Sequence, residues 1–168
     1  MKMCSKSLTL LSAGVALLIA GSALRSTANA TPVDFEGVWR TVEVVVEGPN
    51  PQTFNPGATL AIFHGRHYSR VEVNAGGPRP ALNDPAAASA SELRATWGPF
   101  VGEAGTFEVS GNTITMQALV AKNPAAMTKG AVSVYNYQRN GGTLTLTQVR
   151  PYSGANTAPV TIKLVRVE

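Results

Sequence analysis

The sequence predicts an all-β fold, an eight-stranded antiparallel up-and-down barrel with one short helix between the third and fourth strands. Two observations lead to this prediction. Eight runs of about 6 to 9 residues are rich in β-branched side chains or alternate between apolar and polar residues, as half-buried strands do. Short segments of turn-forming residues join nearly all of them, which favours sequential hairpins. Eight such strands can close into a barrel that exposes no sheet edge.

The first 30 residues have the three parts of a secretory signal peptide. Lys2 and Lys6 give a cationic start, residues 8–24 are almost wholly apolar, and Ala28-Asn29-Ala30 matches a small-residue cleavage site. The alternative is a membrane anchor, but the apolar run is shorter than the roughly 20 residues that a bilayer span requires. We therefore expect cleavage after Ala30 and a secreted or periplasmic protein. Its single domain would cover residues 31–168 and have no stable membrane span.

Removal of this segment changes the composition that bears on function. Cys4 is lost, so the mature chain can form no disulfide. The formal charge falls from +4 to +1, because three of the 14 basic residues are removed while all 10 acidic residues remain. A chain this close to neutrality gives no support for a nucleic-acid partner.

The first three strands are expected at residues 40–47, 58–63 and 66–73. The first is rich in valine and ends at a Gly-Pro pair. The second and third flank His64-Gly65, a two-residue connection typical of a tight hairpin.

The helix is expected to begin at Asp84-Pro85, after a loop at residues 74–85. An Asp can cap a helix, and a Pro is favoured at the first helical position. The helical segment continues through Ala- and Ser-rich residues to Trp97, and a Gly-Pro pair follows it.

Five further strands complete the predicted barrel. The Gly-Asn pair before residue 113 and the Asn-Gly pair before residue 143 are turn signals, and the second is the strongest hairpin signal in the chain. The five strands are expected at residues 105–110, 113–120, 131–139, 143–149 and 159–167.

Alternation along the strands predicts which side chains face the interior, since neighbouring residues point to opposite sides. In the third strand, Arg66, Tyr68, Arg70 and Glu72 form a mostly charged set that is expected to face water. His67, Ser69, Val71 and Val73 are therefore expected inside. The same reasoning places Met116 and Ala118 inside, whereas the strand that carries Tyr135 and Tyr137 is ambiguous. Arg166 follows Ile162 and Leu164 at an inward position, where it needs a partner.

An early Gly-x-Trp, eight sequential strands and an Arg near the C-terminus resemble the lipocalin, or calycin, superfamily. In that superfamily the Trp closes the barrel floor and the Arg packs across the indole. The matching residues here are Gly37, Trp39 and Arg166. The resemblance therefore implies that the first and last strands meet at a structural floor.

The chain is more specifically similar to bacterial lipocalin-like domain proteins. The chain lacks the cysteines of animal lipocalins in its mature part, and its expected helix does not follow the eighth strand. The ligand residues of those proteins therefore cannot be transferred. The matching segments are GVWR (37–40), LAIFHGRHYSRV (60–71), GTFEVSGNTIT (105–115), AKNP (121–124) and GGTLTLT (141–147).

The candidate ligand-binding residues follow from the inward set. His67 is expected to orient a ligand head group, with a structural histidine that bonds Ser69 or a backbone carbonyl as the alternative. Lys122 is a candidate cation at the barrel rim. His64 and His67 form His-x-x-His, but the motif spans a hairpin turn without a third ligand, so no metal or other cofactor is expected. The full candidate set is His67, Ser69, Val71, Met116, Ala118, Lys122, Tyr135 and Tyr137.

The sequence favours an exported protein that binds a small hydrophobic or amphipathic molecule in the barrel lumen, rather than an enzyme. Two alternatives remain open. One is a barrel enzyme of the isomerase or cyclase type that uses His67. The other is an envelope interaction protein with a filled barrel, which would contact a partner through loops such as residues 74–85.

Overall fold

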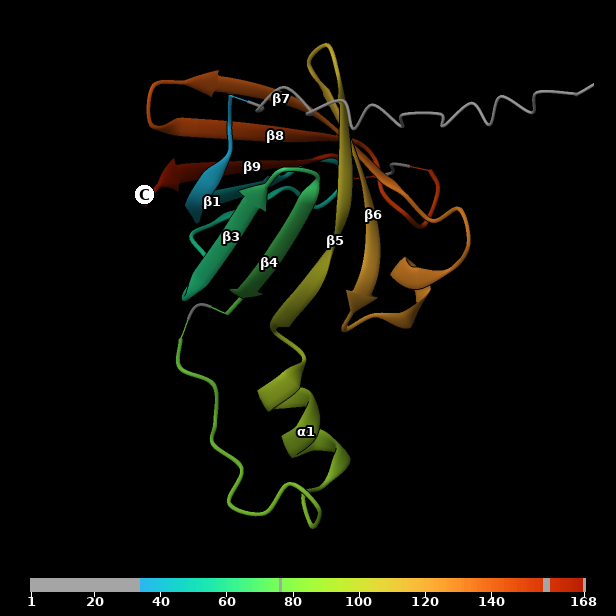
Figure 1. Cartoon of the computed structure of the whole chain (residues 1–168). Helices are drawn as coiled ribbons and strands as arrows, with labels where there is room; N and C mark the ends of the chain where they lie inside the picture. The colour runs from blue at the N-terminus through green and yellow to red at the C-terminus, as the bar shows by residue number, and fades with distance from the viewer. Residues whose placement is uncertain (1–33, 76, 156–157, 168) are drawn as a thin grey trace, which may run out of the picture.

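The computed structural model describes residues 34–75, 77–155 and 158–167, and the predicted signal peptide lies outside them. The predicted all-β class is confirmed (Figure 1). The strands are β1 (Gly37–Val46), β2 (Gln52–Phe54), β3 (Thr59–His64), β4 (His67–Val73), β5 (Phe100–Ser110), β6 (Thr113–Ala121), β7 (Ser133–Asn140), β8 (Thr143–Arg150) and β9 (Val160–Arg166). The helices are α1 (Ala90–Trp97) and the 3₁₀ helix η1 (Pro124–Met127).

The predicted antiparallel barrel is also confirmed. β1 and β3 to β9 pair with their neighbours in chain order, and β1 also pairs with β9, which closes the sheet. β2 is an extra strand beside the second half of β1. The sequence analysis did not predict it, because three residues between prolines carry no alternation. This extra strand changes the numbering, so the helix lies between β4 and β5 and not between the third and fourth strands, although it still follows the strand predicted at residues 66–73.

A β-bulge in β1 resolves the conflict in the burial pattern of that strand. The pairing with β9 shifts between Thr41 and Glu43, so Val42 is the extra residue. Trp39 and Thr41 are buried before the bulge and Val44 is buried after it. One extra residue reverses the alternation, so both halves of the strand turn an apolar side inward.

An aromatic cluster fills the end of the barrel where β1 begins. Phe35 is fully buried, with its ring centroid 5.3 Å from that of Phe63, 5.7 Å from that of Phe107 and 4.9 Å from that of Tyr137. Trp39 is also fully buried, and its indole Nε1 donates a hydrogen bond to the Phe35 carbonyl oxygen at 2.8 Å. We call this end of the barrel the closed end.

Arg166 of β9 lies over Trp39 at this closed end. Its guanidinium carbon is 5.1 Å from the indole centroid, and it donates a hydrogen bond to the carbonyl oxygen of Glu36. Arg166 was expected to point inward, where burial of its charge would be costly. Its side chain instead stays exposed and covers a buried ring. Gly37 has φ of 132°, a conformation that favours glycine, and lets the chain enter β1 beneath the barrel.

The helix α1 begins later than predicted, at Ala90 instead of next to Asp84. Ser89 is its N-cap and forms a capping box with Glu92, whereas the Asp84 side chain accepts a hydrogen bond from the Ala86 N–H in a separate turn. No α1 residue is buried, and Figure 1 shows the helix beyond the ends of β4 and β5. Among the described residues, no helix combines the length and the apolar character that a membrane span would require.

Candidate functional site

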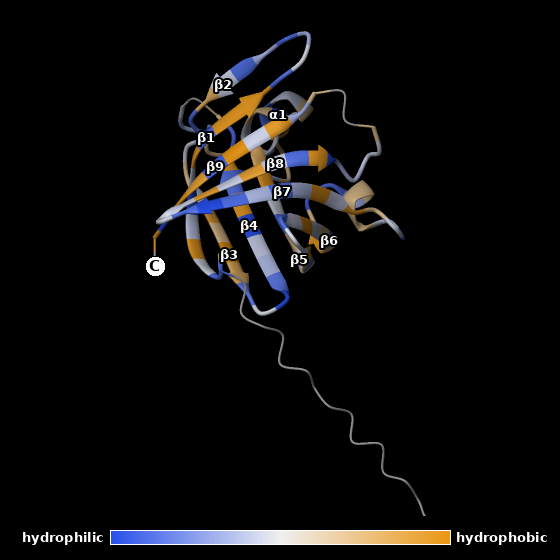
Figure 2. Ribbon diagram, turned by 90° about the horizontal axis from the view of Figure 1, so that it is seen from above, coloured by the Kyte–Doolittle hydropathy of each residue, from blue (hydrophilic) through white to orange (hydrophobic). Residues whose placement is uncertain are grey.

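The inward face of β4 is the opposite of the predicted one. Tyr68 and Glu72 are 5% and 4% exposed, whereas His67 is exposed and Val71 is 39% exposed. Figure 2 shows β4 as largely hydrophilic beside the more hydrophobic β3. The expectation that His67, Ser69 and Val71 line the lumen was therefore wrong. The prediction assumed that charged residues face water, but a charged side chain can lie inside when a well-placed opposite charge and hydrogen bonds offset its loss of hydration.

The other candidate residues lie in different parts of the fold. Met116 is buried as predicted, and with Ala118 it borders a cavity of only about 10 Å³. That space holds at most one water molecule. Tyr135 is buried, and Tyr137 packs against Phe35 at the closed end. The lumen between these residues is filled by side chains, so it offers no deep apolar cavity for a ligand.

Arg70 lies inside the barrel between two carboxylates. Its Nε is 3.2 Å from Oε1 of Glu72, two residues along the same strand, and its Nη2 is 3.1 Å from Oε1 of Glu103. Glu103 is the direct cross-strand partner of Arg70 on β5. Antiparallel pairing therefore brings the two residues together from distant parts of the sequence.

Burial opposes the charge of Arg70, but the neighbouring Tyr135, Glu72, Glu103 and Tyr68 outweigh this effect and raise its pKa above the ordinary arginine value. Burial, and next the nearby Glu103, raises the pKa of the Tyr68 phenol above its usual range. At neutral pH the Arg70 guanidinium is therefore cationic and the Tyr68 phenol is uncharged. We call Tyr68, Arg70, Glu72, Glu103 and Tyr135 the polar layer.

A cavity of about 560 Å³ opens above the polar layer, at the end of the barrel opposite the aromatic cluster. Arg70 and Glu103 form part of its wall, together with Val101, Ala121 and Tyr152. The side chains of Arg70 and Glu103 keep 21% and 17% of their surface exposed. Charged groups of the polar layer are therefore accessible from this mouth cavity.

Lys122 borders the mouth cavity but is not a free cation at its rim. Its Nζ donates hydrogen bonds to the carbonyl oxygens of Trp97, Gly98 and Phe100, with Nζ–O distances of 3.1 Å to Gly98 and 2.7 Å to Phe100. These contacts attach the end of α1 and the start of β5 to the loop after β6. The three N–H donors of its ammonium group are occupied by backbone.

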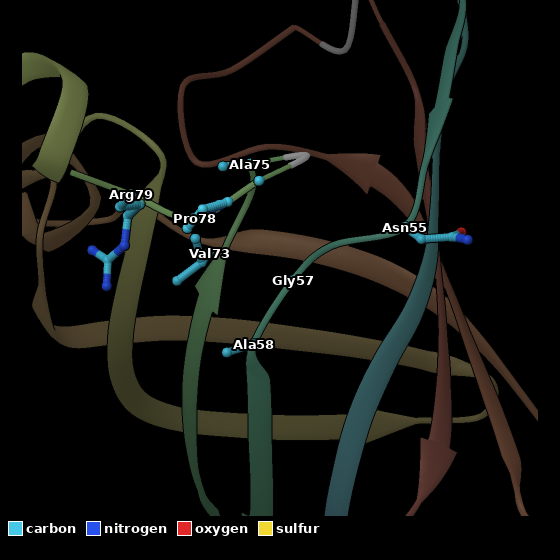
Figure 3. A pocket seen from close by; sticks show the side chains of 8 residues that line it. Asn55, Gly57, Ala58, Val73, Ala75, Pro78 and Arg79 are labelled. Atoms are coloured by element: carbon cyan, nitrogen blue, oxygen red, sulfur yellow. The ribbon is translucent and has the colours of Figure 1, made fainter.

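Two of the further hollows lie beside β3 and β4, outside the lumen. One has a volume of about 460 Å³, and Figure 3 shows Asn55 on one side of it and Arg79 on the other, with Val73 and Pro78 between them. The guanidinium of Arg79 is committed to the Phe100 ring, 5.5 Å from its centroid. The second hollow is an apolar groove of about 220 Å³ along the outer face of β3 and β4.

Sequence reasoning missed Arg70, Glu72 and Glu103, which are charged residues that the fold brings together inside the barrel. One signal was available. Arg70 and Glu72 lie on the same side of the strand as Tyr68, so that side carries one aromatic side chain and two opposite charges. Opposite charges two residues apart on a strand can pair with each other inside a barrel. Among the described residues, no group of three or more His, Cys, Asp or Glu side chains is arranged to hold a metal ion.

The comparisons with known proteins assign no family to this chain. No family model matches it, and no curated protein matches it. The crystal structure of an uncharacterized protein from Bacteroides eggerthii is similar to this chain with a TM-score of 0.41 and 10% sequence identity. The match covers 77% of this chain and 98% of that one. A likeness this distant assigns neither a family nor an activity.

Proposed function

We propose that this protein is an exported, lipocalin-like binding protein that holds one small amphipathic molecule in the mouth cavity, above the polar layer. The signal-peptide pattern of residues 1–30 supports the proposal of export, and the contact of Trp39 with Arg166 supports the proposed lipocalin-like assignment. The observation that carries the binding proposal is the cavity of about 560 Å³, with Arg70 and Glu103 in its wall. Cavities of this size with a few convergent polar groups are typical ligand sites.

The ligand position differs from the one that the sequence suggested. The lumen around Met116 has no space for a ligand, so affinity has to come from the apolar walls of the mouth. Val101, Ala121 and Pro124 supply such surface, while Arg70 and Glu103 supply directional contacts. Apolar burial then accounts for affinity, and the polar pair orients the ligand.

The two alternative functions are affected differently by the structure. A barrel enzyme that uses His67 has lost its proposed base, because His67 is exposed outside the lumen at the β3–β4 hairpin. An envelope interaction protein with a filled barrel is supported by the packed closed end. Its contact surface would include the outer face of β3 and β4, where Leu60 and Ile62 are 40% and 39% exposed.

Binding of a neutral fluorescent amphiphile, 1-aminoanthracene, tests the ligand-binding proposal. We expect saturable binding with one site per protein, and a loss of binding in the Ala121→Trp variant, because the indole would occupy the mouth cavity. Val120→Trp is the matched control. Val120 is the neighbouring residue, is 61% exposed and does not line the cavity, so this variant should bind as the wild type does.

Circular dichroism of both variants confirms that each retains its strands. Absence of saturable binding, or equal binding by the wild type and Ala121→Trp, would overturn the proposed site.

A further inference from the structure

The charges around the mouth cavity sum to zero, and this bears on the ligand class if the proposed binding site is correct. Arg70, Lys122 and Glu103 line the cavity, and Glu72 does not line it but forms an ion pair with Arg70, so the lining charges and this ion-pair partner sum to zero. Arg79 stacks on the Phe100 ring and donates a hydrogen bond to the Thr96 carbonyl oxygen, and among the described residues it neither lines the cavity nor pairs with a carboxylate. A charged ligand group would therefore enter a site that is already balanced, and it would lose its hydration without gaining a counter-ion.

The polar pair in the cavity wall presents a donor and an acceptor side by side. The guanidinium of Arg70 carries five N–H donors; its Nε lies beside Glu72 and its Nη2 beside Glu103, so its remaining Nη donors are the ones that a ligand in the cavity can meet. Glu103 uses Oε1 in the ion pair with Arg70, and no contact from the described part of the chain engages its Oε2. The two side chains are 3.1 Å apart, so one small group can contact both.

Lys122 does not alter this assignment. Its ammonium group is held by three backbone carbonyl oxygens, so it supplies charge to the site without a free donor. The donor that faces the ligand is Arg70, and the acceptor is Glu103.

We propose that the ligand of the mouth cavity carries an electrically neutral head group with a hydrogen-bond acceptor and a donor on adjacent atoms, such as a primary carboxamide, a ureido group or a lactam. The acceptor oxygen of that group binds Arg70, and its N–H binds Glu103. An apolar tail or ring lies against Val101 and Ala121. The inference rests on the proposed function and names the ligand class for that site.

Three eight-carbon compounds with the same tail test the head group: octanamide, octanoate and octylamine. Each competes with bound 1-aminoanthracene near neutral pH, where octanoate is anionic and octylamine is cationic. We expect octanamide to bind at least about tenfold more tightly than either ion, since hydrogen bonds to charged groups contribute this much. Equal or tighter binding of either ion would overturn the inference.

Two variants change the charge of the site in opposite directions. They test the order of affinities among the three compounds, which does not depend on the absolute affinity of any one of them. Glu103→Gln leaves an excess positive charge of one and is nearly isosteric, so the preference should shift toward octanoate. Arg70→Met leaves an excess negative charge, so the preference should shift toward octylamine. Glu103→Gln alone decides the question if Arg70→Met does not fold.

The outcomes separate the two proposals. Binding of 1-aminoanthracene that none of the three compounds displaces would overturn the head-group inference and leave the binding site intact. If 1-aminoanthracene itself does not bind, the proposed function and this inference both fail. An unchanged order of affinities in Glu103→Gln would show that the charges do not select the ligand.

Discussion

Replacement of Phe35 by Ala should remove a large part of the stability of the barrel. The side chain is fully buried, and its ring contacts three others, those of Phe63, Phe107 and Tyr137, at 4.9 to 5.7 Å between centroids. Truncation of a buried Phe costs about 3–5 kcal/mol, a range that includes the cavity left behind. The loss of three aromatic pairs argues against the lower end of the range, and we expect about 4 kcal/mol.

A loss of this size is a large fraction of the roughly 5–15 kcal/mol that stabilises a domain. Urea unfolding followed by circular dichroism measures it, and with a slope of about 2 kcal/mol per molar the midpoint should fall by about 2 M. Phe35→Leu keeps most of the apolar volume and should cost about 1.5 kcal/mol. Leu119→Ala is the control, because Leu119 is 63% exposed and its truncation should stay within about 0.5 kcal/mol.

The reasoning would be refuted if Phe35→Ala lost less than about 1.5 kcal/mol, or no more than Leu119→Ala. Either result would mean that the aromatic cluster does not hold the closed end together.

Three other predictions concern β5, α1 and the attachment between them. A Cβ on Gly105 would lie 2.0 Å from a backbone carbonyl oxygen of β6, so Gly105→Ala should cost about 1–3 kcal/mol in urea unfolding. Gly142→Ala, where a Cβ meets nothing within 4 Å, should be near neutral, and equal effects would contradict the steric argument. Hydrogen bonds from the side chain and backbone of Ser89 lower the pKa of the Glu92 carboxyl. The stability that Glu92 adds through the cap is therefore fully present above the ordinary Glu pKa, and it is lost as the pH falls through the lowered pKa of Glu92. Titration of Glu92 by NMR should show this, Ser89→Ala should move the pKa back toward its ordinary value, and an unmoved pKa would exclude Ser89 as the cause. Lys122→Met should speed amide hydrogen exchange across α1 while the unfolding midpoint changes little, and unchanged exchange would show that Lys122 does not hold the helix.

Much of the barrel could be predicted from local patterns. The hairpins at Gly65, Gly111 and Gly141 place glycines with positive φ at the turns, where the sequence signals had located them. Alternation correctly predicted that Met116, Ile162 and Leu164 are buried. These features depend on residues that are neighbours in the chain, so the sequence contains the information directly.

The candidate site was predicted poorly for the opposite reason. His67 and Val71 were assigned to the lumen because the alternative set on that strand was charged. Whether a charged set can face inward depends on a partner, and the partner of Arg70 is Glu103 on the next strand of the barrel. The register that joins them is a property of the closed sheet, and no local pattern shows it.

The sequence by itself determined the class of the fold, the order of its hairpins and the residues of the floor. Turn chemistry and two-residue periodicity act over a few residues, and the pairing of Trp39 with Arg166 followed from a resemblance carried by those two residues. Only the tertiary structure decided which face of β4 is inside, that the lumen is filled, and that the accessible cavity lies at the mouth. These outcomes depend on how side chains from separate strands pack together in the interior and on which opposite charges come into contact there. Both are decided only when the barrel closes.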